Sequence, residues 1–452
     1  MKDAVVKDVV ILGGGSGGYA AAFRAAQLGL SVTLIEKDKV GGTCLHRGCI
    51  PTKALLHAAE VADTARESSA VGVKASFDGM DIAGVHAYKD GVVAKLYKGL
   101  QGLVSAHKIE LISGTGRYVG DRTVEVDGHR ITGKSVVLAT GSYSKVLPGI
   151  ELGPRVLTSD QALTLDSVPT RAIVLGGGVI GVEFASVWAS FGADVTIVEA
   201  LPRLVAAEDE WASKQLTRAF KKRGITAKTA SPFTGVKETP DGVTVTLESG
   251  ETLDADVLLV AVGRGPNTSD LGEISLDSGF VGVDDALQTS DAGVYAVGDI
   301  VRGPQLAHRG FQQGIFVAEQ IAGLNPKSVP DSGIPRVTYS NPEIASVGLT
   351  EAQAVEQHGT ADTVVYDLAG NGKSQILGAS GGVKLVRGGG AVVGIHMVGA
   401  RVGELIGEAQ LVVNWGAYPE EVAHLIHAHP TQSEAFGEAH LALAGKPLHS
   451  HG

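Results

Sequence analysis

The sequence predicts an α/β fold of two parallel-sheet domains followed by a C-terminal α+β domain. Three observations predict it: the length of 452 residues, a segment that occurs twice, and a change of pattern near Arg336. A chain of this length favours two to four domains with buried cores. The repeated segment is DVVILGGGSGGYAAAFRAAQLGLSVTLIEKD at 8–38, echoed by RAIVLGGGVIGVEFASVWASFGADVTIVEAL at 171–201.

Each copy of the repeat has the order of a nucleotide-binding βαβ unit. An apolar run is followed by G-x-G-x-x-G, a stretch of helical period, and a second apolar strand that ends in an acid. The glycines let a pyrophosphate approach the backbone, the helix N-terminus meets its charge, and the acid accepts from ribose hydroxyls. The alternative is a duplicated unit whose turns bind nothing. We expect two Rossmann-like dinucleotide-binding domains, with ligands Gly13, Gly15, Gly18 and Glu36 in the first and Gly176, Gly178, Gly181 and Glu199 in the second.

The acids indicate which dinucleotides bind. A carboxylate accepts a bond from a ribose 2′-hydroxyl and repels a 2′-phosphate, so Glu199 favours NAD over NADP. Arg203 lies four residues further on, and we expect it to be solvated rather than to bind phosphate. Glu36 requires a second dinucleotide, for which FAD is the economical choice if hydride passes onward to sulfur.

Beyond Arg336, strand-like runs such as GGVKLVR and AVVGIHMVG precede amphipathic helical stretches, which predicts the α+β domain. The composition excludes several other classes of protein. Lys and Arg total 38 against 49 Asp and Glu, and the net charge of −11 argues against nucleic-acid binding. Two cysteines exclude a disulfide-stapled extracellular scaffold. No signal-peptide pattern or long apolar run occurs, so we expect a cytoplasmic protein without a membrane span.

The two cysteines stand together in GGTCLHRGCIPTK at 41–53. On an ideal helix the Cα atoms of Cys44 and Cys49 would lie roughly 8.7 Å apart, beyond the ~4.4–6.8 Å of a disulfide. A bridge therefore requires bent backbone, which Gly48 and Pro51 favour, and a small constrained ring should be reducible. Free buried cysteines, a zinc site that includes His46 and a structural bridge are the alternatives. Proximity to the first nucleotide unit favours redox exchange with a flavin.

A dithiol reacts as its thiolate, so the chemistry also needs a base. His429 precedes Pro430 and is followed by Glu434, whose carboxylate could hold one ring nitrogen and fix the tautomer. The residues alone fit a plain hydrogen-bonded pair as well. They also leave rival histidines in the same region, namely His424, His427 and His440.

These motifs, with VGD at 297–299, LAH at 306–308 and HAHPTQSEAFGEA at 427–439, resemble the flavoprotein disulfide reductases, most closely the dihydrolipoamide dehydrogenases. The resemblance covers essentially the whole chain. It implies a homodimeric enzyme that reoxidises dihydrolipoyl groups of 2-oxo-acid dehydrogenase or glycine cleavage complexes, using FAD and NAD. No lipoyl segment precedes the first unit, so we expect the carrier on another protein. The expected domains are FAD-binding at 1–148 and 265–333, NAD-binding at 149–264, and a C-terminal interface domain at 334–452.

The resemblance also implies residue roles. Cys44 would exchange with substrate sulfur, and Cys49 would lie against the flavin as a charge-transfer thiolate. His429, held by Glu434, would be the base, facing the cysteines of the other subunit. Lys53 would lie beside the flavin ring, with Glu183 as its partner near the nicotinamide. Further FAD contacts would be Gly42, Thr43, Gly116, Asp299 and the backbone of Ala307, and Gly263 would contact NAD.

Two alternatives to this function stay open. One is an NAD(P)H-dependent reductase of another small disulfide, similar to glutathione or mycothione reductase; Glu199 argues against it. The other is a flavin-binding structural subunit whose dithiol is not turned over. The first fingerprint also departs from the family in having Ser16 where proline is usual, and the three glycines that matter for FAD are retained.

Overall fold

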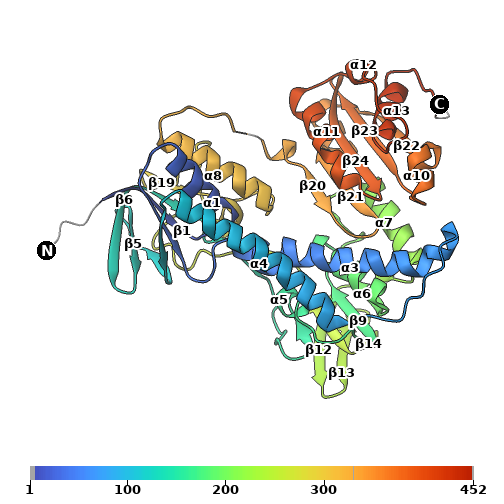
Figure 1. The fold of residues 1–452 in the computed structure, drawn as a ribbon, viewed down its shortest axis with the longest axis horizontal. Coiled ribbons are helices and arrows are strands. Elements are labelled where there is room, and N and C mark those ends of the chain that lie inside the picture. Colours follow the sequence, from blue (N-terminus) through green and yellow to red (C-terminus); the bar gives the residue numbers. More distant parts are fainter. Residues whose placement is uncertain (1–5, 329, 450–452) are drawn as a thin grey trace. The chain divides into compact units, whose positions relative to one another are not determined.

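The computed structural model describes residues 6–328 and 330–449 (Figure 1). The chain forms two compact units, each with its own internal contacts. The first unit holds the described residues of Met1–Leu55, Ala83–Lys145 and Gly263–Val329; the second holds those of Leu56–Ile82, Val146–Val262 and Pro330–Gly452. Among the described residues, no helix combines the length and the apolar character needed to cross a membrane.

The first unit is built on a sheet whose central strands are parallel, in the order β3-β2-β1-β6, with β19 pairing to β6. Strands β5 and β4 extend it in the antiparallel sense. Strands β1 and β2 are apolar over most of their length because both faces of a parallel sheet are covered. Their bounds are β1 Lys7–Leu12, β2 Val32–Glu36, β3 Glu110–Ser113, β4 Gly116–Tyr118, β5 Thr123–Val126, β6 His129–Leu138 and β19 Val294–Ala296.

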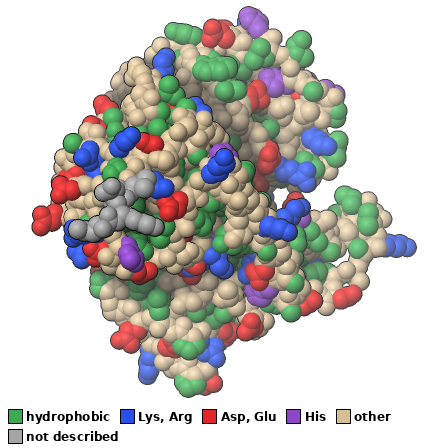
Figure 2. Space-filling model, turned by 60° about the vertical axis from the view of Figure 1, so that its left-hand side comes forward, with side chains coloured by type: hydrophobic (Ala, Val, Ile, Leu, Met, Phe, Trp, Pro, Cys, Tyr) green, Lys and Arg blue, Asp and Glu red, His purple; other side chains and the backbone are tan. Residues whose placement is uncertain are grey.

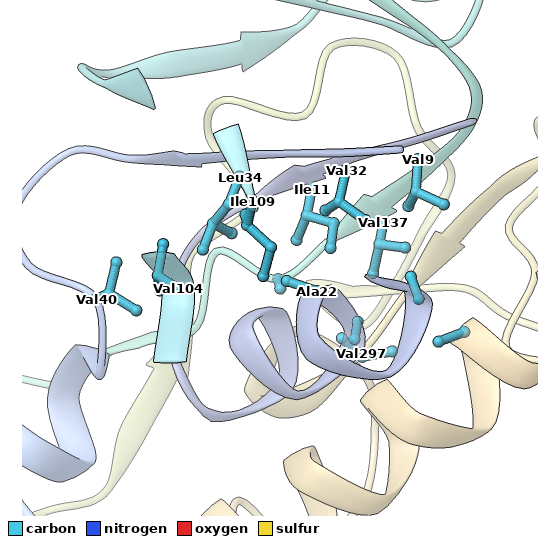
Figure 3. Packing of buried hydrophobic residues seen from close by; sticks show 14 of the residues in the cluster. Val9, Ile11, Ala22, Val32, Leu34, Val40, Val104, Ile109, Val137 and Val297 are labelled. Atoms are coloured by element: carbon cyan, nitrogen blue, oxygen red, sulfur yellow. The ribbon is translucent and has the colours of Figure 1, made fainter. Parts of the chain in front are cut away.

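Helices α1 (Ser16–Gln27) and α8 (Ala307–Ile321) lie side by side on one face of this sheet (Figure 1). They pack closely because glycines face each other: a Cβ added to Gly314 would overlap the carbonyl oxygen of Gly17. Figure 3 shows the valines and leucines of the sheet lying over the small residues of α1. Other elements that start or lie in this unit are α2 Gly42–Arg47, α3 Cys49–Glu67, α4 Ile82–Ala106, η2 Gly298–Ile300, β7 Ser142–Ser144, β16 Arg264–Pro266, β17 Leu276–Asp277 and β18 Phe280–Val281.

The second unit repeats the parallel architecture. Its sheet has the order β11-β10-β9-β15-β8, so β11-β10-β9-β15 corresponds to β3-β2-β1-β6. A three-stranded antiparallel sheet, β12-β13-β14, packs against it. The bounds are β8 Val156–Leu157, α5 Ser159–Ala162, β9 Arg171–Leu175, α6 Val179–Phe191, β10 Asp194–Val198, α7 Glu210–Lys222, β11 Thr226–Lys228, β12 Phe233–Thr239, β13 Gly242–Leu247, β14 Thr252–Ala255 and β15 Val257–Val260; η1 Ser68–Val71 precedes them in the chain.

The C-terminal part of the second unit is an antiparallel sheet, β20-β21-β24-β23-β22, covered by helices. Its core includes Tyr366, Met397 and Phe436. The bounds are η3 Asp331–Gly333, β20 Arg336–Thr338, β21 Glu343–Gly348, α9 Glu351–His358, β22 Asp362–Asp367, η4 Leu368–Gly370, α10 Gly372–Ile376, β23 Gly382–Gly388, β24 Ala391–Gly399, α11 Val402–Trp415, α12 Pro419–Val422 and α13 Glu434–Leu443. The predicted fold class, including an α+β region from Arg336, is confirmed.

Ion pairs with buried carboxylates join the start of α7 to the C-terminal sheet of the second unit, which the sequence did not predict. Arg336 of β20 binds Glu208, with Nε 3.0 Å from Oε1. Lys384 of β23 binds Asp209, with Nζ 2.8 Å from Oδ1. Elsewhere, acidic and basic side chains are interspersed on the face drawn in Figure 2.

Candidate active site

The first glycine fingerprint forms a tight turn between β1 and α1. Gly13 has a φ of +104°, and a Cβ there would overlap the carbonyl oxygen of Ala139. A Cβ on Gly18 would overlap the carbonyl oxygen of Gly13, so the third glycine lets α1 approach the strand. Gly15 is the N-cap of α1, with no side-chain cap. The first amides of α1 therefore keep no side-chain partner at the cap and are available to a phosphate group.

The second fingerprint makes the same contacts. Gly176 has a φ of +110° and closes against the carbonyl oxygen of Ala261, and a Cβ on Gly181 would overlap the carbonyl oxygen of Gly176. Gly178 is the uncapped N-cap of α6, and a Cβ there would meet no atom within 4 Å. Both turns thus present an open helix N-terminus that glycine keeps clear, which fits the pyrophosphate of a dinucleotide.

Both strand-end acids hold their turns in the same way. Glu36 Oε2 accepts from the Gly14 amide at 2.6 Å, and Oε1 accepts from the Asp38 amide at 2.9 Å. Glu199 Oε2 accepts from the Gly177 amide at 2.6 Å, and Oε1 accepts from the Leu201 amide at 2.7 Å. The sequence predicted these acids as ribose ligands and did not predict that they also stabilise the loops.

Arg203 differs from the expectation of a solvated side chain. Its guanidinium turns inward and donates to the carbonyl oxygens of Glu208 and Ala206, each at 2.7 Å. The group is therefore engaged by backbone acceptors, and Glu199 is the charged group at the strand end. This arrangement suits a ribose with a free 2′-hydroxyl.

The two cysteines stand at a break between two helices. Helix α2 ends at Arg47, α3 begins at Cys49, and Gly48 lies between them, so the predicted bend is confirmed. A Cβ on Gly48 would lie 3.0 Å from the carbonyl oxygen of Thr43, so glycine lets the two helices meet this closely. Both thiols are half-buried.

The thiols contact each other. A hydrogen bond with the Cys49 sulfur, followed by burial, raises the pKa of Cys44, while the ammonium of Lys53 acts in the opposite direction. The amide of Cys49 also hydrogen-bonds the Cys44 sulfur. Burial, and then the negative charge of the two sulfurs, raises the pKa of the half-buried Tyr19 phenol to about 12. The structure thus groups both sulfurs, Lys53 and Tyr19 in the unit that carries the first fingerprint.

His46, the third residue of the alternative zinc site, has a hydrogen bond and a ring contact of its own. Its Nε2 lies 3.0 Å from the carbonyl oxygen of Val40, and its ring stands edge-on to Tyr97 at 5.0 Å between centroids. With Nε2 as the donor to this carbonyl, Nδ1 keeps the lone pair of the ring. Among the described residues, no cluster of three metal-ligating side chains occurs.

The other predicted FAD residues also fall in the first unit. Gly42, with a φ of +59°, faces Gly15, because a Cβ on Gly42 would lie 2.7 Å from the Gly15 Cα. Thr43 follows it in α2, and Ala307 is the first residue of α8. Asp299 lies in η2 and accepts a 2.5 Å hydrogen bond from the Ser142 hydroxyl.

Two predicted glycines have structural reasons of their own. A Cβ on Gly116 would lie 2.6 Å from Leu12 Cδ1, so this residue is needed for packing at the strand ends. Gly263 has a φ of +103° just after the last strand of the second parallel sheet. Glu183 lies in α6 and accepts from the Tyr339 amide at 2.9 Å, a partner from the C-terminal sheet region that the sequence did not suggest.

His429 and Glu434 are paired as predicted, with Nδ1 and Oε1 2.8 Å apart. The second carboxylate oxygen accepts from the Thr431 amide at 2.8 Å. Burial opposes ionisation of Glu434, but the Thr431 amide and the His429 ring outweigh it and lower the pKa of this carboxyl group. Because the carboxylate accepts from Nδ1–H, Nε2 carries the lone pair. The His429 side chain is 78% exposed, so this nitrogen is accessible in the single chain.

The rival histidines have other environments. His427 Nε2 lies 2.8 Å from Glu408 Oε1, and this hydrogen bond raises its pKa. His440 is fully buried, its Nδ1 bonds the Phe436 carbonyl oxygen, and burial lowers its pKa to about 4. His424 is exposed on the chain between α12 and α13. Only His429 combines a carboxylate on Nδ1 with an exposed Nε2 among these four.

Comparison with known proteins identifies the family. The sequence profile of the pyridine nucleotide-disulphide oxidoreductases matches residues 7–314, and the profile of their dimerisation domain matches residues 334–440. A dihydrolipoyl dehydrogenase of Bacillus subtilis (strain 168) is 41% identical over 98% of this chain and 99% of its own length. The mitochondrial dihydrolipoyl dehydrogenase of Pisum sativum is 39% identical over 98% of this chain and 92% of its own.

Solved structures agree with the sequence relatives. LpdA from Mycobacterium tuberculosis superimposes with a TM-score of 0.89 at 28% identity, covering 97% of this chain and 100% of that one. The HOCl-induced flavoprotein disulfide reductase RclA from Escherichia coli gives a TM-score of 0.87 at 26% identity, covering 97% and 99%. The two glycine turns, the paired thiols and these matches together show that the chain belongs to the pyridine nucleotide-disulphide oxidoreductase family.

Proposed function

We infer that the protein is an NAD-dependent dihydrolipoamide dehydrogenase, which converts a dihydrolipoyl group and NAD⁺ into a lipoyl group, NADH and a proton. The observation that carries this is the contact between the Cys44 and Cys49 thiols at the start of α3, within the unit that holds the first nucleotide turn. As a family member the protein is a homodimeric flavoprotein oxidoreductase that uses FAD and NAD. Relatives about 40% identical over their full length carry the name dihydrolipoyl dehydrogenase.

The sulfur chemistry uses the cysteine pair in its oxidised form. A dihydrolipoyl thiolate attacks Cys44, which forms a mixed disulfide and releases Cys49 as the thiolate. The second dihydrolipoyl thiolate then attacks the lipoyl sulfur of that mixed disulfide. This step closes the lipoyl ring and releases Cys44, so the cysteine pair has gained two electrons and the carrier has lost them.

The base in this reaction is His429. Its free Nε2 accepts the proton of the dihydrolipoyl thiol, and Glu434 stabilises the imidazolium that results. By resemblance to the family, this histidine would face the cysteines of the other subunit, so the homodimer would be the catalytic unit.

The residues of the two turns fit the cofactors. We assign FAD to Gly13, Gly15, Gly18, Glu36, Gly42, Thr43, Lys53, Gly116, Asp299 and Ala307, and NAD to Gly176, Gly178, Gly181, Glu183, Glu199 and Gly263. When bound, FAD would supply two-electron redox chemistry between the cysteine pair and NAD⁺. Lys53 provides positive charge next to the sulfurs, and Asp299 binds ribityl hydroxyls.

We also propose the domain boundaries, the partners and the location of the enzyme. Residues 1–148 and 265–333 would bind FAD, residues 149–264 would bind NAD, and residues 334–452 would form the dimer interface. The lipoyl groups would arrive on 2-oxo-acid dehydrogenase or glycine cleavage complexes in the cytoplasm. Support for these assignments comes from the positions of the two glycine turns and from the dimerisation-domain match.

The decisive experiment compares Cys44→Ser with Cys49→Ser in the purified flavoprotein. Both variants should lose NADH formation from dihydrolipoamide while retaining bound flavin. Cys49→Ser keeps the exchanging sulfur, so it should still form a mixed disulfide with an aromatic disulfide probe, detected by mass spectrometry, whereas Cys44→Ser should form much less. Turnover by Cys44→Ser would contradict the sulfur assignment. If the wild-type enzyme reduced glutathione disulfide or mycothiol disulfide as fast as it reduces lipoamide, the assignment of the lipoyl group as its substrate would be wrong.

A further inference from the structure

Two short strands carry the chain between the units, and one arginine binds them together. β7 leads out of the first unit and β16 leads back into it, and they pair antiparallel, with Arg264 opposite Ser144. The Arg264 guanidinium reaches over β7: Nε donates to the Ser142 hydroxyl at 2.7 Å, and Nη2 donates to the Ser142 carbonyl oxygen at 2.8 Å. A third bond, from Nη1 to the Ser144 hydroxyl, is longer at 3.2 Å.

The Ser142 hydroxyl in turn donates a hydrogen bond to the Asp299 carboxylate, with Oγ and Oδ2 2.5 Å apart. The direction of both bonds follows from the groups involved. Arginine has donors only, so the hydroxyl accepts from Nε and its own proton goes to the carboxylate. Ser142 is 7% exposed, so water does not compete well for these bonds. Both bonds involve a charged group, the class that contributes most strongly.

The Asp299 carboxylate is thereby hydrogen-bonded through one of its two oxygens. Its Oδ2 is engaged by Ser142, and no hydrogen bond from another described residue reaches Oδ1. The backbone of η2 is fixed separately, because the Gly298 amide donates to Gln313 Oε1 at 2.7 Å and the Asp299 carbonyl oxygen accepts from Gln305 at 3.4 Å. The carboxylate is thus oriented through Oδ2, and Oδ1 is left for a ligand.

We propose that Arg264 and Ser142 are positioning residues that orient Asp299 toward the hydroxyls of the FAD ribityl chain. The proposal rests on the role of Asp299 in the proposed function. Neither residue needs to touch the cofactor, because each acts through the next: Arg264 orients the hydroxyl, and the hydroxyl orients the carboxylate. The flavin is then held by a carboxylate whose orientation is fixed before binding, which lowers the entropy lost on binding.

The test measures the rate at which purified holoenzyme releases FAD on dilution, followed by the gain in flavin fluorescence. Ser142→Ala should release FAD roughly tenfold faster, as expected for one hydrogen bond to a charged group. Ser142→Thr keeps the hydroxyl and should restore slow release. Ser144→Ala is the matched control, because it removes only the 3.2 Å bond and should behave as wild type.

A double-mutant cycle separates this proposal from the proposed function. If Ser142 acts through Asp299, the effects of Ser142→Ala and Asp299→Asn on release should be strongly non-additive. If Ser142→Ala released FAD at the wild-type rate, or if the effects of the two substitutions were fully additive, the positioning role of Ser142 would be wrong. The role of Asp299 in binding FAD would still stand. If Asp299→Asn itself released FAD as slowly as wild type, the Asp299 assignment would fail instead. Circular dichroism of each variant shows whether faster release reflects unfolding.

Discussion

At the scale of single residues, the base that we propose, His429, is held by a carboxylate that the backbone holds in turn. Glu434 is the first residue of α13. One of its carboxylate oxygens binds His429 Nδ1, and the other accepts from the Thr431 amide. The histidine is therefore fixed in the tautomer that leaves Nε2 as the acceptor. Its neighbour His427 is tied to Glu408 through Nε2, so it cannot offer that nitrogen in the same way.

We predict that His429→Gln lowers kcat with dihydrolipoamide by about 10²–10⁴, the usual contribution of a positioned base. Steady-state NADH formation measures it. His424→Gln is the matched control, because it makes the same substitution at an exposed histidine of the same segment and should leave the rate near wild type. A near-normal rate for His429→Gln would assign the base to another residue.

We predict that Glu199→Gln lowers the preference for NAD over NADP by roughly tenfold, since the repulsion of a 2′-phosphate and the bond to a 2′-hydroxyl both weaken. The ratio of kcat/KM for the two cofactors measures this. Glu36→Gln is the control: it removes the equivalent carboxylate from the first turn, so it should leave the ratio unchanged. An unchanged ratio in Glu199→Gln would remove this residue from the explanation of specificity.

At the scale of helices and strands, glycines decide how closely elements approach. Helices α1 and α8 meet at Gly17 and Gly314, and α2 meets α3 at Gly48. The bend at Gly48 could be predicted from the sequence because a local distance argument required it. The contact between α1 and α8 could not, since nothing in a single sequence indicates which of 62 glycines face each other from distant segments.

We predict that Gly314→Ala destabilises the protein by about 1–3 kcal/mol, the cost of overpacking, because the new methyl group would overlap the Gly17 carbonyl oxygen. Gly91→Ala in α4 is the control: its methyl group would meet no atom within 4 Å, so it should stabilise the helix by about 0.5–1 kcal/mol. Urea unfolding of the two variants measures the difference. Equal stability of both variants would contradict the close packing of α1 on α8.

At the scale of the whole molecule, buried charges and histidines link stability to pH. In the second unit, Glu208–Arg336 and Asp209–Lys384 join the start of α7 to the C-terminal sheet, and the Asp209 pair needs an ionised carboxylate. Burial opposes the ionisation of Asp209, but Lys384 and backbone amides outweigh it, so its pKa is lowered. At Asp209 the folded state therefore binds fewer protons than the unfolded state as pH falls, and the Asp209–Lys384 pair loses its contribution in acid.

Buried His440 acts in the same direction. Its pKa falls from an ordinary 6.5 to about 4 on folding, so the unfolded chain binds a proton first as pH drops. Its contribution is intact above about pH 6.5 and declines by roughly 3 kcal/mol toward pH 4. We predict that His440→Leu narrows the difference in urea midpoint between pH 7.5 and pH 5. If the urea midpoint changed equally with pH in the wild type and in His440→Leu, folding would not lower the pKa of His440.

The sequence predicted the architecture because period, repetition and turn chemistry are local. It located the strands on both sides of each fingerprint, the α+β region after Arg336 and the pairing of His429 with Glu434. It did not predict the contacts that depend on distant segments meeting. The whole second parallel sheet separates Ser142 from Asp299 in the chain, and no local signal marks the first serine of β7 as a partner of an aspartate.

The loops after β2 and β10 differ in sequence, yet each is fixed by a backbone amide two residues beyond its acid. Every residue except proline has such an amide, so Asp38 and Leu201 can be exchanged for other residues without loosening the turn. Each of these positions can thus be altered in the laboratory, or by natural variation, while the turn is kept. The duplicated unit therefore separates the part that preserves shape from the part that can acquire a new preference.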